Sequence, residues 1–572
     1  MTKIGAMNKV FLSAWLSLAL AGCGGGGSSS GSSVAGTGGQ GGTTFPATIP
    51  APDATDIAPP PAAASVEKLC EAPRPAGTID PLTRQPYGDM LGSLTLEKQW
   101  IRAYVNETYL WFDEVPAINS NYFAIGNTVP YIEPSDNIAS SKKLLTNSDV
   151  VTTYFNSQRT RATTPSGKPK DPFHFTYDTK VWAALATSGA GVGFGMDIAL
   201  VAAKPPRQAI VAFTTPNTPA TQAGIARGAQ IITVNGVDVA NGSDLATLNE
   251  ALFSPISGTR YTFSIRDLGA TSARTVTLSA IDTTAVPVQN VGVLPAPNAT
   301  VGYMLFNEHI ATAEGQLITA VNQLKAANGG AGISDLVLDL RYNGGGYLDI
   351  ASELAYMIAG SSATSGKAFE RLSYNSKNPF GQTAAQATTP FHSSTVGFGG
   401  TAANQPLPQL NLSQVFVLTG NGTCSASEAI MNGLRGAGIK VIQIGNTTCG
   451  KPYGFYSQDN CSTTYFTIQF KGVNNAGFGD YADGFIPAGT GTTANNLPGC
   501  AVADDYTHAL GDPAEGRLAA ALQYRASGSC PAPLPSSVRL AGLLGFGSSI
   551  GVDPKLHRSA LQENRFYRAP TR

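Results

Sequence analysis

Short apolar runs alternate with longer runs of helical periodicity in the second half of the chain, and this alternation limits the fold more than any other feature. The apolar runs are VGYMLF (301–306), DLVLDL (335–340), QVFVLTG (414–420) and KVIQIG (440–445). Continuous apolar runs of this length are typical of strands buried on both faces. Because helical runs separate them, the strands are expected to be parallel. We therefore predict an α/β core at 297–530, interrupted by a polar, glycine-rich insertion.

Two further regions precede this core. Residues 75–180 contain the run LTLEKQWIRAYVNETYLWFDEVP. Trp100, Tyr104 and Trp111 have the spacing to share one buried helical face there, and Thr95 is a plausible N-cap, so we predict a small helical domain. From 189 to 285 short β-rich runs dominate, with a short helix after Pro219 and a hairpin turn in VNGV. The fold class predicted for the chain is multidomain α+β.

The first 65 residues predict an export signal and a tether. Lys3 and Lys9 accompany the apolar stretch VFLSAWLSLALA, which is too short to span a bilayer and ends near Cys23. The letters LAGC resemble the bacterial lipoprotein box, which implies that 1–22 are removed and that Cys23 carries lipid. An ordinary secretory signal is the alternative. Residues 23–65 are rich first in glycine and serine and then in proline, as a flexible and then stiffer tether would be.

The charge and the cysteines limit the partners and the compartment. A formal net charge of −1 gives no electrostatic reason to expect nucleic acid. Six cysteines besides Cys23 favour disulfides in an exported protein, with fifteen pairings open. We expect Cys449 to pair with Cys461, which would brace the segment after Lys451. A zinc site is the weaker alternative because no C-x2-C pair occurs.

One serine and one lysine are the candidates for catalysis. Ser425, in GTCSASE (422–428), falls between a predicted strand and a predicted helix, where the helix N-terminus favours developing negative charge. Such a serine is either a nucleophile or simply a helix cap, and Ser427 also suits the cap. Lys451, in TTCGKPYG, follows the next parallel strand, so both residues are expected at the same edge of the sheet. A lysine acts as a base when apolar burial lowers its pKa.

Three motifs in this order resemble the carboxy-terminal processing, or tail-specific, proteases. The run TCSASEAIMNGLRG followed by GKPYGF is similar to the family's serine and lysine motifs, and DLRYNGGG (339–346) is similar to its D-L-R-x-N-x-G-G turn. The resemblance covers about 95–525 and implies a protease core of the ClpP/crotonase type. It implies Ser425 as the nucleophile and Lys451 as the base, without metal or cofactor. It also implies an oxyanion hole from Ala426 with Gly344 or Gly345.

The β-rich region resembles the PDZ domain of bacterial proteases. The run TPATQAGIARGAQIITVNG follows that domain's pattern, although Ala229 stands where aspartate is usual. The resemblance implies that Gly191, Val192, Gly193 and Phe194 bind a peptide's terminal carboxylate. Proteins or peptides with apolar C-termini are the expected partners. Together with the lipid anchor, the resemblance implies a bacterial cell envelope protein, at the outer membrane facing the periplasm.

One departure from the family leaves the function open. Many members carry a glutamine four residues after the lysine, and this chain has Phe455 there. Gln458 is our candidate for a third catalytic residue, and a Ser-Lys dyad is the alternative. An inactive, lipid-anchored PDZ protein that binds C-termini is the rival function. A Ser-Lys enzyme acting on cell-wall peptides is less favoured, since SSKK (140–143) lacks companion motifs. No function is assigned to the tail at 531–572.

Overall fold

A computed structural model describes residues 50–132, 139–490 and 494–532. The predicted signal at 1–22, the lipidation site Cys23, most of the tether and almost all of the C-terminal tail lie outside these described residues. Within the described part, no helix has the length and apolar character needed to cross a membrane.

The N-terminal region is built from helices around an aromatic core. Its longest helix, α3, is capped by Ser93, whose hydroxyl accepts the N–H of Leu96 at 3.3 Å. The predicted cap Thr95 is therefore wrong, because the helix begins one residue before it. Trp100 and Tyr104 are buried on one face of the helix, as predicted, and their rings are stacked. The prediction is wrong for Trp111, because α3 ends before it and Trp111 is only half-buried. The helices are α1 (Ala54–Ile57), α2 (Ala63–Val66), α3 (Leu94–Thr108), α4 (Asn147–Ser157) and α5 (Thr179–Ser188), with 3-10 turns η1 (Phe112–Glu114) and η2 (Ser120–Tyr122).

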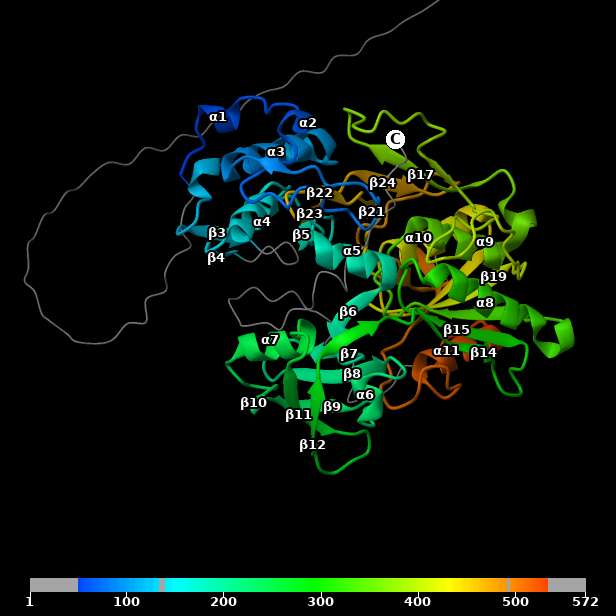
Figure 1. Cartoon of the computed structure of the whole chain (residues 1–572). Helices are drawn as coiled ribbons and strands as arrows, with labels where there is room; N and C mark the ends of the chain where they lie inside the picture. The colour runs from blue at the N-terminus through cyan, green and yellow to red at the C-terminus, as the bar shows by residue number, and fades with distance from the viewer. Residues whose placement is uncertain (1–49, 133–138, 491–493, 533–572) are drawn as a thin grey trace, which may run out of the picture. The chain divides into compact units, whose positions relative to one another are not determined.

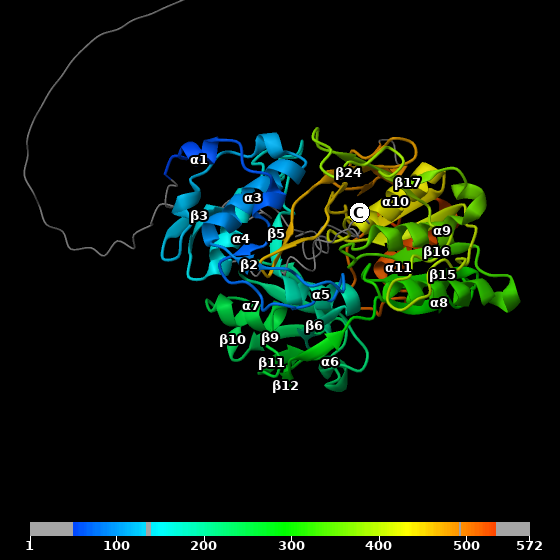
Figure 2. The same ribbon diagram turned by 45° about the horizontal axis from the view of Figure 1, so that its top comes forward.

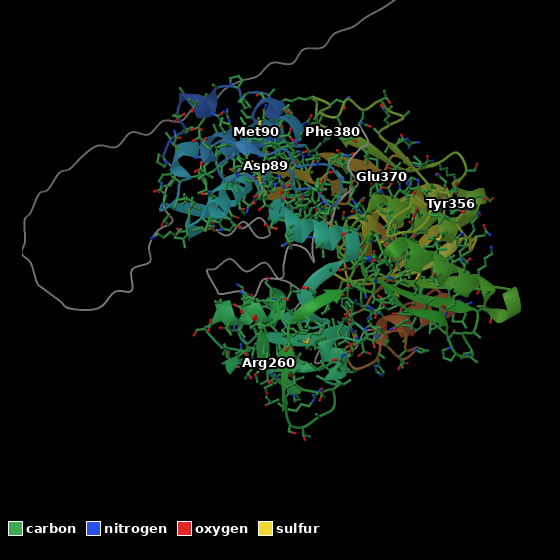
Figure 3. The ribbon with its side chains drawn as sticks, viewed as in Figure 1. Asp89, Met90, Arg260, Tyr356, Glu370 and Phe380 are labelled. Atoms are coloured by element: carbon green, nitrogen blue, oxygen red, sulfur yellow. A yellow bond between two sulfur atoms is a disulfide. The ribbon has the colours of Figure 1, made fainter. Side chains whose placement is uncertain are left out.

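A segment that follows Lys451 completes this N-terminal region. Strand β5 (Phe175–Asp178) pairs antiparallel with β23 (Thr463–Phe466), which pairs with β22 (Gln458–Asn460), so residues far apart in sequence share one sheet (Figures 1 and 2). Arg74 reinforces the junction by bonding to Asp89 (labelled in Figure 3) and to Asp459. Smaller pairs are β1 (Leu69–Cys70) with β2 (Met90–Leu91), and β3 (Thr128–Ile132) with β4 (Ala139–Lys143).

The β-rich region forms a separate sheet with its own core. The strand order is β12-β11-β9-β8-β7, with β10 beside β9. The predicted hairpin is confirmed: Val234 faces Val237, and Asn235 and Gly236 both have positive φ in the turn. The elements are β6 (Ala190–Gly193), β7 (Met196–Ala202), β8 (Gln208–Thr214), α6 (Pro219–Gln222), β9 (Gln230–Val234), β10 (Val237–Asp238), α7 (Leu245–Phe253), β11 (Arg260–Arg266), β12 (Arg274–Ser279) and β13 (Ile281–Thr284).

The predicted α/β core is present around a sheet of order β14-β15-β16-β19-β20-β27-β25, with β26 beside β27. Strands β15, β16, β19, β20 and β27 are parallel, as the alternating pattern predicted. The elements are β14 (Val288–Val293), β15 (Val301–Phe306), α8 (Ala313–Ala326), η3 (Asn328–Gly330), β16 (Asp335–Asp339), α9 (Leu348–Thr364), β19 (Gln414–Thr419), α10 (Ala426–Ala437), β20 (Lys440–Gly445), β25 (Ile486–Pro487), β26 (Gly489–Thr490), β27 (Asn496–Ala501) and α11 (Gly516–Ser527).

Both faces of this sheet are buried, which explains why its strands are apolar throughout. Met304 and Phe306 of β15 pack with α8, α9 and α10, whereas Tyr303 and Leu305 pack on the opposite face with α11 (Figure 1). Parallel strands end at one edge, and the segments after β16, β19 and β20 carry the predicted catalytic motifs. A second sheet, β18-β17-β24-β21, lies beyond this edge and is built from β17 (Ala368–Tyr374), β18 (Thr388–Pro390), β21 (Tyr453–Gly454) and β24 (Phe470–Val473).

Candidate active site

Ser425 occupies the strained junction between β19 and α10. It is the N-cap residue of α10, with φ 55° and ψ −114°, a backbone conformation that non-glycine residues rarely adopt. Such strain persists at functional sites when the surrounding structure holds it. The residue is only 5% exposed. A serine in this position has its oxygen beside the unpaired N–H groups at the start of a helix, where negative charge is stabilised.

Ser427 does not cap the helix. It lies inside α10, and its hydroxyl donates to the backbone oxygen of Asn343 at 3.1 Å. The prediction that Ser427 is the cap is therefore wrong, since α10 begins at Ala426 and leaves Ser425 as the N-cap. Ser427 instead ties the helix to the turn that follows β16.

Lys451 is buried in apolar surroundings with an aromatic ring on two sides. Its Nζ lies 4.1 Å from the ring centroid of Phe455 and 4.6 Å from that of Phe173, and the residue is 1% exposed. Burial lowers the pKa of Lys451 from 10.5 to about 7, against the opposing charges of Asp171 and Glu428. That change corresponds to about 5 kcal/mol against the ammonium. A cation–π contact supplies only about 0.5 to 2 kcal/mol, so burial decides the outcome.

Glu428 connects the serine segment to the lysine segment. A single oxygen, Oε2, accepts the N–H of Ser425 at 3.1 Å and the N–H of Lys451 at 2.8 Å. Oε1 accepts the N–H of Gly450 at 2.9 Å and the hydroxyl of Thr448. The carboxyl is fully buried, and burial raises its pKa although these hydrogen bonds oppose the rise. Glu428 therefore fixes the backbones of both candidate catalytic residues against one side chain.

A buried polar cluster from the N-terminal region lies close enough to act on Lys451. Burial would raise the pKa of Asp171, but its contacts with His174, the Tyr109 hydroxyl and Arg159 lower it. Burial lowers the pKa of His174. The backbone oxygen of Phe155 accepts from His174 Nε2 at 2.9 Å. The pair is thus a carboxylate beside a neutral imidazole, and the negative charge of Asp171 partly offsets the desolvation of Lys451.

The turn after β16 supplies backbone N–H groups next to Ser425. A Cβ atom built on Gly345 would lie 2.9 Å from the Ser425 Cβ, so only glycine fits this approach. Gly345 donates its N–H to Asn343 Oδ1 at 2.9 Å. The N–H groups of Gly344 and Ala426 have no hydrogen-bond partner among the residues described. Of the three predicted oxyanion donors, the structure thus leaves Gly344 and Ala426 available.

Arg341 anchors this turn through buried hydrogen bonds. Its guanidinium is fully buried and bonds Asp339 at 2.9 Å and both oxygens of Glu515, the N-cap of α11, at 2.7 and 2.9 Å. It also bonds Asp504 at 2.8 Å. Asp504 in turn accepts from Arg227, which comes from the loop before β9. The turn between β16 and α9 (residues 340–347), the candidate oxyanion turn, is therefore connected to the β-rich region through charged, largely buried hydrogen bonds.

The six described cysteines form three disulfides. They are Cys70–Cys461, Cys424–Cys449 and Cys500–Cys530. The predicted pair Cys449–Cys461 is wrong, because β22 and β23 carry Cys461 into the N-terminal region, where it meets Cys70. Cys424, Glu428 and Cys449 place potential metal-ligand atoms within 4.8 Å of one another. The two sulfurs are bonded to each other there, and a disulfide does not offer thiolate ligands.

The remaining predicted site residues lie elsewhere. Gln458 is in β22, and its amide nitrogen donates to Glu67 Oε1 and to the backbone oxygen of Asp459, each at 3.3 Å. Residues 191–193 form part of β6, which pairs with β13. Phe194 is buried against Tyr261 and Phe263.

Sequence reasoning missed four residues that shape this site: Asp171, Phe173, Glu428 and Asn343. Glu428 gave a signal, since it stands three residues after Ser425 at the start of an otherwise apolar helix. Asp171 and Phe173 gave none that tied them to Lys451, because their proximity depends on pairing between β5 and β23.

Comparison with known families gives two matches. Residues 300–458 match peptidase family S41, and residues 186–250 match the PDZ domain. No curated protein matches the chain. The chain is therefore a multidomain α+β protein with a PDZ domain and an α/β core, and residues 300–458 of that core match peptidase family S41, a family of serine-type peptidases.

The chain is similar to several solved structures. A Bacteroides fragilis NCTC 9343 protein assigned to the S41 proteases is 21% identical, with a TM-score of 0.50, and the match covers 75% of this chain and 97% of that one. The photosystem II D1 C-terminal processing protease is 18% identical with a TM-score of 0.37, over 70% and 92% of the two chains. Mature CPAF, complexed with lactacystin, is 12% identical with a TM-score of 0.30, over 53% and 79%.

Proposed function

We propose that this chain is a serine endopeptidase of the C-terminal processing type that uses a Ser425–Lys451 dyad. The observation that carries the proposal is the buried Lys451, whose pKa of about 7 makes it a base near neutral pH. Glu428 supports the assignment because it bonds the backbones of both residues through one oxygen. A lysine in a purely structural role has no need of full burial on a segment that shares a carboxyl oxygen with a strained serine at a helix N-terminus.

The proposed reaction hydrolyses a peptide bond in two stages. Neutral Lys451 takes the hydroxyl proton of Ser425 while the serine oxygen attacks the scissile carbonyl. The N–H groups of Ala426 and Gly344 donate to the oxyanion. The Lys451 ammonium then gives its proton to the leaving amine. Water, deprotonated by the same lysine, hydrolyses the acyl-enzyme and restores Ser425. No metal or organic cofactor is required for these steps.

The PDZ domain is proposed to recruit the C-terminal tails of substrates. Strand β7 is the last strand in the order of its sheet, so an extended tail can add beside it through backbone hydrogen bonds. The N–H groups of Gly193 and Phe194, just before β7, are proposed to hold the terminal carboxylate. The PDZ match supports peptide binding in general, and apolar tails are part of the proposal.

Export and lipid anchoring belong to the same proposal. Three disulfides support an oxidising compartment such as the bacterial periplasm. The signal and the tether after Cys23 support attachment to the outer membrane, and all of these residues before residue 50 lie outside the described part of the chain.

The test is cleavage of an unfolded protein that ends in an apolar tail. The full chain is compared with Ser425→Ala and Lys451→Ala. Cleavage by the parent alone supports the dyad. Tail binding without cleavage by all three proteins would overturn the enzyme assignment and favour a tethered peptide-binding protein. The observation that favours this second candidate is Phe455, which stands where the resembling family has a glutamine.

A further inference from the structure

One of the three disulfides links the segment that carries Ser425 to the segment that carries Lys451. Cys424 immediately precedes Ser425, and Cys449 stands two residues before Lys451. The other two bridges connect different places: Cys70–Cys461 joins β1 to the turn between β22 and β23, and Cys500–Cys530 joins β27 to the segment after α11. Only Cys424–Cys449, among the bridges of the described residues, cross-links the serine segment to the lysine segment.

The bridge acts on segments that have little regular structure of their own. Residues 446–452 follow β20 and precede β21, so no ladder of helix or sheet bonds holds Lys451. Their ties to the serine segment include the hydrogen bonds of Glu428, the bond from Cys449 N–H to the oxygen of Thr423 at 3.0 Å, and the disulfide. The N–H of Cys424 also donates to the oxygen of Asn343 at 3.2 Å. The two cysteines of the bridge thus connect the serine segment, the lysine segment and the turn after β16.

The two cysteines of this bridge differ in burial. Cys424 is 1% exposed and packs in the aromatic core that contains Phe455, whereas Cys449 is half-buried. We therefore expect a reducing thiolate to attack the bridge from the side of Cys449. The bridge is fully buried on the side of Ser425 and partly exposed on the side of Lys451.

We propose that Cys424–Cys449 is a positioning disulfide that keeps Ser425 and Lys451 in catalytic register and that its reduction switches the peptidase off. This inference rests on the proposed function. In the reductive step, one thiolate of a small dithiol attacks the Cys449 sulfur and breaks the S–S bond, and Cys424 leaves as a thiolate that takes a proton. The second thiol of the reductant then displaces Cys449, which also takes a proton. The protein gains two electrons and two protons, and the dithiol becomes a cyclic disulfide.

Reduction is expected to change the chemical step and to leave binding intact. A misplacement of about 1 Å can cost a factor of about 100 in rate, so we expect kcat to fall by about 10-fold to 100-fold. KM and tail binding should change little, because the PDZ sheet has its own core. Loosening the lysine segment also admits water to Lys451, so the residual activity should reach its half-maximum at a higher pH than in the oxidised protein.

The test compares the oxidised full chain, the same protein after dithiol treatment, and Cys424→Ala/Cys449→Ala. Mass spectrometry after thiol alkylation establishes which bridges are open. The matched control is Cys500→Ala/Cys530→Ala, which removes a bridge outside the site. We expect the parent and the control to lose kcat on reduction and regain it on reoxidation. The Cys424/Cys449 variant should have low kcat that the dithiol does not change further, with a native circular dichroism spectrum.

The outcomes separate this inference from the proposed function. If the oxidised parent does not cleave peptides, the proposed function fails. If the parent cleaves and keeps its kcat and pH profile after Cys424–Cys449 is shown to be open, the peptidase stands and the positioning disulfide is refuted. A rise in KM together with loss of tail binding and of the native circular dichroism spectrum would also refute it, because that pattern indicates general unfolding.

Discussion

The Nζ of Lys451 lies 4.1 Å from the centre of the Phe455 ring. Phe455 stands where many of the proteases that the sequence motifs resemble have a glutamine, and its ring is an apolar face that excludes water. With Phe173 on a second side, the lysine lies in surroundings that favour its neutral form. The departure that seemed in the sequence to weaken the catalytic assignment thus helps to explain how Lys451 can serve as a base without a third residue.

The buried lysine should leave a signature in the pH dependence of stability. The pKa of Lys451 is about 7 in the folded protein and near 10.5 when unfolded, so between these values the unfolded state binds the extra proton. Stability should therefore rise with pH through this window, by up to about 1.4 kcal/mol per pH unit. Denaturant unfolding of the parent and of Lys451→Met should show this rise only in the parent. Parallel curves would contradict the assigned pKa.

Replacing the Phe455 ring with a smaller side chain should raise the pKa of Lys451. Phe455→Leu leaves room for water near Nζ, so the pH of half-maximal peptidase activity should move upward, at a stability cost of about 1 to 2 kcal/mol. Phe123→Leu is the matched control, because Phe123 is equally buried in the same core but packs on Tyr154. A similar stability loss with an unchanged pH profile is expected for the control. An unmoved profile in Phe455→Leu would count against the role of the ring.

Glu428→Gln should disable catalysis because an amide nitrogen cannot accept the N–H groups that the carboxylate now binds. We expect kcat to fall by at least about 100-fold, since both catalytic backbones lose their shared acceptor, and stability to fall by about 2 to 3 kcal/mol. Glu314→Gln is the control: Glu314 is also buried and accepts the N–H groups of Val396, Gly397 and Phe398. It should lose stability and keep kcat. Comparable kcat in both variants would refute the special role of Glu428.

Removing the charge of Arg227 should uncouple the PDZ domain from the oxyanion turn. Arg227 bonds the hydroxyl of Tyr342 at 2.6 Å and Asp504 at 2.8 Å. We expect Arg227→Met to bind tails with unchanged Kd and to cleave them several-fold more slowly. Arg260→Met, an exposed position at the start of β11 (Figure 3), is the control and should behave like the parent. Weaker tail binding by Arg227→Met, with kcat intact, would contradict this coupling.

The sequence predicted the parts of the fold that local periodicity determines. The apolar runs at 301–306 and 414–420 became parallel strands, and VNGV became a hairpin turn, because neighbouring residues alone specify these elements. Ser425 and Lys451 could be singled out because each follows a strand of the same parallel sheet. Peptide cleavage itself stays a prediction.

The parts that depend on distant segments could not be predicted. Phe173 reaches Lys451 only because β5 pairs with β23, almost three hundred residues later in the chain. Cysteine pairing has the same origin, since spacing does not reveal that Cys70 meets Cys461. The two predicted helix N-caps were wrong for a local reason. Ser93 and Thr95 are equally suitable caps for one helix, and Ser425 and Ser427 for the other, so packing decides which residue of each pair is the cap.

The rate at which a serine-directed fluorophosphonate labels Ser425, measured against pH, tests the central claim most directly. If neutral Lys451 activates Ser425, labelling of the full chain should reach half its maximum near pH 7, the pKa of Lys451. Lys451→Met should be labelled slowly at every pH. Labelling that rises only near pH 10.5, or equal labelling of the parent and Lys451→Met, would contradict the dyad.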